Sequence, residues 1–258
     1  VVSIMNAWAG LGSEELTLDD VWPAVAASGV QGLALVLPVP GDPLGLVSTG
    51  AFAREALAAE VGVVLVTEQL RIGWVPEPDL RGSSYRGVRW RVYAEPLGDG
   101  VAPGALPGDA AATGADDPNR IVEQADRALS RSLRAATDAL AGLDLATWRP
   151  EVAAGRTEAE AALHAAAQLM PPAWPLPARA LAERALALWR VVQIARADPG
   201  AASASGSLAR AETLGMLSHA VREAAMAAYN VPASTMTRAA TRGSRGHTQP
   251  ESARHRPT

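Results

Sequence analysis

The chain has 258 residues, a hydrophobic content of 48% and a formal net charge of −4, values that suit an ordinary globular protein. It contains no cysteine and no lysine, so all 23 of its basic residues are arginine. The lack of cysteine excludes disulfides, a thiol nucleophile and a thiolate zinc site. The lack of lysine excludes Schiff-base chemistry and a P-loop. We expect neither a cofactor nor a metal ion in this protein.

The beginning of the chain predicts a helix. Residues 16–29, LTLDDVWPAVAASG, place Thr17 and Asp20 as a capping box and Gly29 at the C-terminal stop. The preceding Glu14 and Glu15, without an early basic residue, do not fit a secretory signal. No apolar run approaches the roughly 18 residues that a membrane span requires. We therefore expect a soluble cytoplasmic protein with no membrane partner.

Two apolar runs follow, GLALVLPV at 32–39 and VGVVLVTE at 61–68. The segment between them, STGAFAREALAAE, has Phe52, Ala56 and Ala59 on one helical face. Buried runs joined by a helix are typical of a parallel βαβ unit with a right-handed crossover. We therefore predict a mixed sheet that contains such a unit.

The next two strands are predicted by alternation, at residues 70–77 and 87–95, and the turn-rich segment between them indicates a hairpin. On the second strand the alternation separates two faces: Val88, Trp90 and Val92 on one, and Arg89, Arg91 and Tyr93 on the other. With the preceding elements, this hairpin completes a small α/β domain over residues 1–96.

The remainder of the chain divides into three parts. Residues 97–117 are Gly, Pro, Ala and Asp without periodicity, which indicates a flexible linker. Residues 118–231 predict an antiparallel helical bundle, because apolar residues recur at steps of three and four. The four helical segments lie around residues 122–143, 158–170, 181–195 and 214–228. Residues 232–258 are polar and rich in arginine, so we expect a disordered tail.

The stretch LVLPVPGDPLGL, residues 35–46, is the one candidate for a ligand-binding loop. In the ligand hypothesis, backbone amides around Gly41–Gly50 hold an anion at a helix N-terminus. The residues assigned to that site are Gly41, Asp42, Gly45, Ser48, Thr49 and Arg54. In the alternative, the prolines and glycines only turn the chain, and Ser48 or Thr49 caps the next helix. The turn accounts for every residue, and Asp42 adds a negative charge that disfavours an anion.

Other catalytic and metal-binding sites have little support. Glu160 precedes His164 by four residues, and Glu223 follows His219 by four. This spacing is typical of an exposed side-chain pair, whereas carboxylate-bridged metal sites in bundles use a Glu and a His three residues apart. The serines of RGSSYRG, residues 81–87, lack the G-x-S-x-G context of a hydrolase nucleophile. We therefore assign no catalytic residue.

Arginines gather on the predicted hairpin, where Arg86, Arg89 and Arg91 lie near tryptophans and tyrosines. This set could bind an anionic partner surface, or it could simply solvate the face opposite Trp90. The acidic body of the chain argues against a dedicated nucleic-acid binder, although the tail could attract nucleic acid nonspecifically.

Three motifs carry a resemblance to a known family: LVLPVPGDPLGL, the later LDLATWRPEV, and the AAYN of the last helix. Together they resemble a protein family of high-GC actinobacteria, over most of residues 17–231. The 55 alanines and the absence of lysine are consistent with a GC-rich genome. The resemblance implies that source and an intracellular setting. It implies no catalytic residue, because that family has no established activity.

These observations predict an α+β fold, with a small N-terminal sheet domain followed by a helical bundle. The function they favour is that of a non-enzymatic interaction or scaffold protein, which binds another protein or a second copy of itself. The alternative is a binding protein or enzyme for a small anionic ligand that uses the 41–50 loop. A concave site with free amides would support the ligand, whereas a contiguous exposed apolar patch would support docking.

Overall fold

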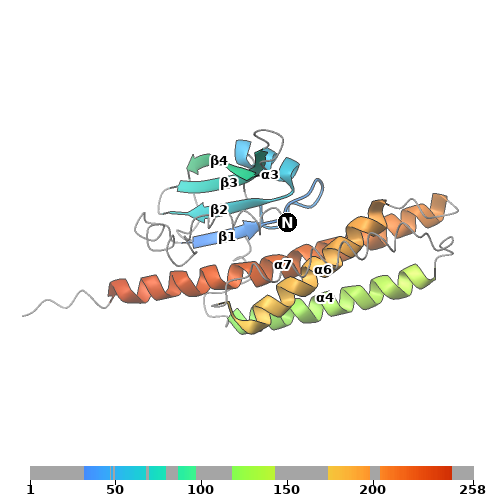
Figure 1. Cartoon of the computed structure of the whole chain (residues 1–258). Coiled ribbons are helices and arrows are strands. Elements are labelled where there is room, and N and C mark those ends of the chain that lie inside the picture. The colour runs from blue at the N-terminus through green and yellow to red at the C-terminus, as the bar shows by residue number, and fades with distance from the viewer. Residues whose placement is uncertain are drawn as a thin grey trace, which may run out of the picture.

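The computed structural model describes residues 32–46, 48, 50–67, 70–79, 87–96, 118–142, 174–197 and 204–245. Within these residues a four-stranded sheet precedes three long helices, which confirms the predicted α+β class (Figure 1). The elements in chain order are β1 (Gly32–Val36), α3 (Ala51–Ala59), β2 (Gly62–Val66), β3 (Leu70–Asp79), β4 (Gly87–Pro96), α4 (Pro118–Ala141), α6 (Leu176–Ala197) and α7 (Ala204–Arg245).

The sheet has the order β1-β2-β3-β4 and is antiparallel throughout, so the predicted parallel βαβ unit is wrong. Val36 at the end of β1 pairs with Gly62 at the start of β2. The chain returns to this end of the sheet because Glu60, in the left-handed region at φ 56°, ends α3 and turns the backbone directly into β2. The long connection before α3, together with α3 itself, thus returns the chain to the end of the sheet at which β1 ends.

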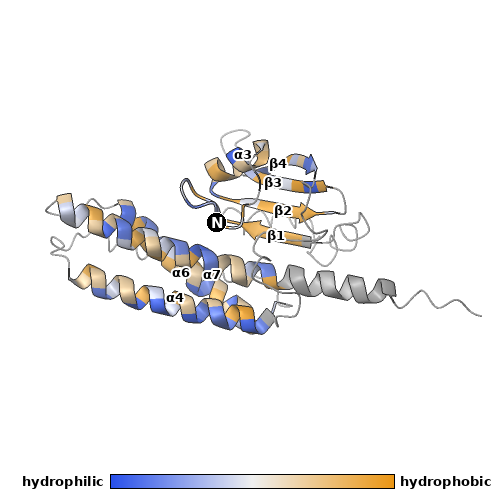
Figure 2. Cartoon of the chain, turned by 180° about the vertical axis from the view of Figure 1, so that it is seen from behind, coloured by the Kyte–Doolittle hydropathy of each residue, from blue (hydrophilic) through white to orange (hydrophobic). Residues whose placement is uncertain are grey.

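β1 and β2 are hydrophobic along their length (Figure 2). They are hydrophobic because both faces of these strands are buried, and not because the strands run parallel. One face, with Leu35 and Val63, joins the core that contains the bundle helices. The other face, with Val36 and Val64, packs under α3 around Phe52. The Phe52 ring lies so close to β3 that a Cβ on Gly73 would fall 2.2 Å from it. The expected apolar face of α3 is therefore confirmed.

The predicted hairpin is confirmed as β3 and β4, which pair from Leu70↔Pro96 to Asp79↔Gly87. Trp90 and Val92 share one face of β4, and Arg89 and Arg91 share the other, as the alternation predicts. β3 tolerates Pro76 because the ladder with β2 ends at Trp74, so no backbone donor is required there.

Within the described residues, the apolar positions that the periodicity predicts are buried or half-buried. The buried positions are Val122, Leu129 and Ala136 on α4, Leu181, Ala185 and Val192 on α6, and Leu214, Leu217, Val221, Ala224 and Ala228 on α7. α7 packs against both α4 and α6, and it also packs against β1 (Figure 1). Among the described residues, no helix combines the length and the apolar character needed to cross a bilayer.

The sequence predicts that the helical bundle ends at residue 231, whereas the last helix continues through Pro232 to Arg245. One proline removes one helical hydrogen bond, whereas the alanines, arginines and methionine that follow it are good helix formers. Several predictions lie outside the described residues. These are the helices at 16–29 and 158–170, the linker at 97–117, His164, the serine loop with Arg86, Thr49, and the tail after residue 245.

Candidate functional site

The loop after β1 consists of two successive tight turns. Val39 and Asp42 exchange both backbone hydrogen bonds at 2.9 Å across Pro40 and Gly41. Gly41 has φ 83°, and a proline followed by a glycine of positive φ is the signature of a type II turn. In the second turn the Leu46 N–H donates to the Pro43 carbonyl at 2.8 Å, with Gly45 at φ 78°. Gly41 and Gly45, which the ligand hypothesis assigns to the anion site, thus provide the positive φ angles of the two turns.

The polar groups at the start of α3 are also hydrogen-bonded to other groups of the chain. The Gly50 N–H donates to Ser48 Oγ at 3.2 Å, and Ser48 Oγ donates to Glu95 Oε2 at 2.5 Å. A carboxylate therefore already lies at this helix N-terminus, where an anionic ligand would have to bind. Arg54 lies exposed on α3.

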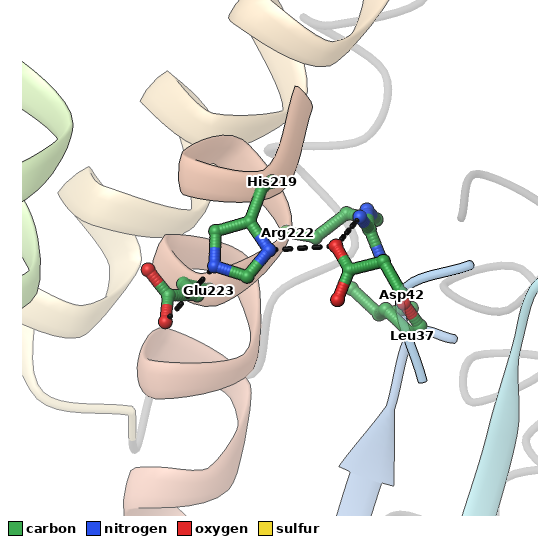
Figure 3. A network of polar contacts seen from close by, with 5 residues as sticks. All are labelled: Leu37, Asp42, His219, Arg222 and Glu223. Atoms are coloured by element: carbon green, nitrogen blue, oxygen red, sulfur yellow. Dashed lines mark hydrogen bonds and ion pairs between the residues drawn. The ribbon is translucent and has the colours of Figure 1, made fainter. Parts of the chain in front are cut away.

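Asp42 links the loop to α7, which lies about 180 residues later in the chain (Figure 3). Its Oδ2 contacts His219 Nδ1 at 2.6 Å and accepts a hydrogen bond from Arg222 Nη2. Arg222 also donates through Nη1 to the Leu37 carbonyl at 2.7 Å. On its other side the His219 ring meets Glu223, with Nε2 3.4 Å from Oε1. We call Asp42, His219, Arg222 and Glu223 the loop–helix cluster.

The electrostatics of this cluster favour a structural link. Burial opposes ionisation of Asp42, but the hydrogen bonds from His219 and Arg222 outweigh it and lower the pKa of the carboxyl group below its ordinary value. The Arg222 side chain is only 6% exposed, and the Asp42 carboxylate balances its buried positive charge. His219 thus lies between two carboxylates, Asp42 on the side of Nδ1 and Glu223 on the side of Nε2.

The sequence did not predict the link between Asp42 and α7. It showed His219 and Glu223 as a local pair, which is confirmed, but it placed His219 opposite the buried seam and assigned it no further partner. One signal was present. Ser218 and Arg222 directly follow Leu217 and Val221, two positions of the predicted apolar seam. An arginine buried beside that seam requires a carboxylate from another element.

α7 also closes the outer edge of β1. The side-chain amide of Asn230 accepts from the Leu35 N–H at 2.7 Å and donates to the Leu35 carbonyl at 3.1 Å. It therefore replaces the backbone of a neighbouring strand, while Arg222 satisfies the Leu37 carbonyl two residues later. An unpaired edge invites association with other strands, and these two side chains prevent it on this side of the sheet.

At the opposite side of the sheet, no described strand pairs with β4 beyond β3. Leu35, Val63, Trp74 and Val92 form one row across the four strands, on a single face. Exposure increases along the row, because Leu35 and Val63 are buried, Trp74 is half-buried and Val92 is 59% exposed. Side chains that a core would normally cover thus reach solvent at β4.

The exposed end of this face is a continuous apolar surface, which we call the apolar strip. Leu70, at 41%, is the second large exposed side chain on it. The Trp74 and Trp90 rings lie 6.2 Å apart at an interplanar angle of 55°, and both also touch the main core. The strip comprises Leu70, Ile72 and Trp74 on β3 and Trp90, Val92 and Ala94 on β4.

The arginines proposed as partner contacts lie on the other face of β4. Arg91 contacts Glu77 at 2.5 Å and Glu55 at 3.8 Å, and Arg89 contacts Glu77 at 3.2 Å. Both side chains remain about half exposed or more. They are therefore neutralised by acids of the same chain, yet they remain accessible.

A separate groove of about 540 Å³ lies between α4 and α7. Its walls include small residues such as Ala128 and Ala220, together with Arg131 and Glu223. Glu223 thus contributes both to this groove and to the loop–helix cluster. The described residues contain no group of three His, Asp or Glu side chains that could hold a metal ion.

Both parts of the chain match models of one known protein family. Residues 2–106 match the Rv1486c-like protein, N-terminal domain, and residues 123–226 match the Rv1486c-like protein, C-terminal domain. The chain belongs to the Rv1486c-like family. This agrees with the actinobacterial resemblance drawn from the sequence. Searches of curated proteins and of solved structures found no match. In this Rv1486c-like protein, the sheet lies within the first match, and most of α4, all of α6 and the first half of α7 lie within the second.

Proposed function

We propose that this Rv1486c-like protein is a non-enzymatic interaction protein that docks onto a protein partner through the apolar strip. The observation that carries this proposal is the position of Trp74, Trp90 and Val92 at the open end of the sheet. Paired aromatic side chains beside an exposed aliphatic one are the kind of surface that protein interfaces bury at their centre. The strip is continuous with the core, so its side chains are held in place before a partner arrives.

The alternative, an anionic ligand in the 41–50 loop, has weaker support. The N–H groups of Asp42, Leu46 and Gly50 already have acceptors within the loop. Asp42 is hydrogen-bonded to Arg222 of α7, and Glu95 places a negative charge at the start of α3. A phosphate or carboxylate would have to displace these contacts before it could bind. This cost favours docking through the strip.

The test compares two substitutions of valine by arginine. Val92 in the strip is 59% exposed, and Val191 on α6 is 56% exposed, so Val92→Arg and Val191→Arg add the same charge at matched exposure. The wild type and both variants are used to capture proteins from an actinobacterial lysate, and the captured proteins are quantified by mass spectrometry. We expect a defined protein that Val191→Arg retains and Val92→Arg loses. If the three captures do not differ, docking of another protein onto the strip is wrong.

A further inference from the structure

The free edge of β4 can be located from the hydrogen bonds at the opposite side of the sheet. In an antiparallel strand, the N–H and C=O of one residue point to the same side, and the side alternates along the chain. Leu35 directs both groups outward to Asn230, so Val63 must bond toward β3, and Trp74 must bond back to β2. Val92, opposite Trp74, therefore directs its N–H and C=O away from the sheet.

By the same alternation, Trp90 and Ala94 also point outward. β4 is the last strand of the sheet, and in the described part of the chain no hydrogen bond is made to these outward groups of Trp90, Val92 and Ala94. The two sides of the sheet thus differ, because α7 closes β1 whereas nothing described closes β4. The open edge borders the apolar strip directly, since the same three residues contribute their side chains to it.

We propose that β4 pairs antiparallel with β4 of a second copy of this chain, which forms a symmetric dimer with a continuous sheet. This inference rests on the proposed function, because it names the partner of the same strip. Two-fold symmetry requires the strand to be complementary to itself. Its charges meet that requirement, since Arg89 lies near its start and Glu95 near its end on the same face. Antiparallel pairing brings the start of one strand to the end of the other.

Backbone direction and charge together select the register. In a continuous sheet, the outward N–H and C=O groups of one β4 must face the outward groups of the other β4. Nearly the whole strand pairs in this way only if the two-fold axis passes through Arg91 or Val92. An axis at Arg91 would place two arginines directly opposite each other, which is destabilising. An axis at Val92 places Arg89 opposite Glu95 of the second copy, and Arg91 opposite Tyr93 of the second copy.

The register centred on Val92 also suits the apolar face. It places the large Trp90 opposite the small Ala94 of the second copy, and Val92 opposite Val92 of the second copy. The two apolar strips then join into one surface across the axis. The exposed arginines retain hydrogen-bonding capacity for this contact, because a guanidinium carries five N–H donors and Glu77 occupies only some of them.

Single cysteines can test this register, since the chain has none of its own. Opposed residues of an antiparallel pair have Cα atoms about 4.5–5.5 Å apart, within the span of a disulfide. We expect Val92→Cys to form disulfide-linked dimers under mild oxidation, and Val191→Cys, with matched exposure, not to form them. Cross-linking of Arg91→Cys faster than Val92→Cys would place the axis at Arg91 and overturn the register. Equal cross-linking of Val191→Cys would overturn the interface.

Sedimentation of the wild type and charge variants tests the pairing without a cross-link. Arg89→Glu and Glu95→Arg should each weaken the dimer about tenfold, because symmetry repeats the altered pair, and the double variant should restore it. Circular dichroism of each monomer shows that the fold is intact. A wild type that stays monomeric at every concentration overturns the dimer. In that case, a protein still captured in a Val92-dependent way would leave the proposed function standing.

Discussion

Asp42→Ala removes the carboxylate that joins the loop to α7, and the structure allows its cost to be worked out. The substitution deletes two charge-assisted hydrogen bonds, from His219 and from Arg222, and hydrogen bonds to charged groups contribute about 1.5–3 kcal/mol each. It also leaves the buried Arg222 guanidinium without a counter-ion, a loss of about 3–5 kcal/mol where both partners are fully buried. Asp42 is 31% exposed and Arg222 keeps the Leu37 carbonyl, so we expect a loss of about 2–3 kcal/mol.

The matched control is Asp126→Ala. Asp126 contacts Arg184 at 2.6 Å, but the two side chains are 46% and 38% exposed. Exposed pairs of this kind contribute about 0.2–1 kcal/mol, since water screens them and both side chains lose freedom. The control therefore removes a carboxylate from an arginine pair that is much more exposed.

The assay is urea unfolding, followed by tryptophan fluorescence, together with thermal unfolding. We expect Asp42→Ala to lower Tm by about 5–10 °C and Asp126→Ala by about 3 °C or less. The wild type should also lose more stability than Asp42→Ala as the pH falls below about 4, because the lowered pKa of Asp42 stabilises the fold only while the carboxyl group is ionised. Equal losses for the two alanine variants would refute the assignment of Asp42 as a buried structural ion.

Four further substitutions test other parts of the fold. Asn230→Ala should cost about 1–3 kcal/mol, because it leaves the N–H and C=O of Leu35 unpaired, and hydrogen exchange at the Leu35 amide should rise with it; an unchanged exchange rate would contradict the edge contact. Gly73→Ala should cost about 1–3 kcal/mol by forcing its methyl group into the Phe52 ring, whereas Gly215→Ala, with nothing within 4 Å, should stabilise α7 by up to about 1 kcal/mol. Burial raises the pKa of Tyr229, so ultraviolet titration should show a late transition well above about pH 10 that Tyr229→Phe abolishes. Because the folded state holds this proton more tightly than the unfolded state, wild-type stability should fall as the pH rises above about 10.

The sequence predicted the elements whose signals are local. The alternation of β4 separated Trp90 from Arg91 correctly, and the steps of three and four located the buried positions of α4 and α7. It failed where the deciding contact is distant. An apolar run such as β2 reports that both faces are buried, but it does not report whether the neighbouring strand is parallel.

The same limit applied to the site. Asp42 was recognised as unsuitable for anion binding, but its actual partners, His219 and Arg222, lie on a helix that no local pattern connects to the loop. The apolar strip was equally hidden, because a half-buried Trp90 and an exposed Val92 have the same alternation as a covered face. Which end of a sheet remains open is determined by tertiary packing, and therefore only the structure could locate the surface.

The closure of β1 by Asn230 has a consequence for how the protein is made. The two residues are 195 positions apart, and the family match to the second domain ends at residue 226, before Asn230. At a synthesis rate of about 5–20 residues per second, β1 leaves the ribosome roughly 10–40 s before the side chain that closes its edge. During that interval neither β1 nor β4 has a partner at its outer edge among the described residues made so far. A chaperone that shields β1 at this stage would protect the chain from aggregation, and the sheet could not be produced alone without the same risk.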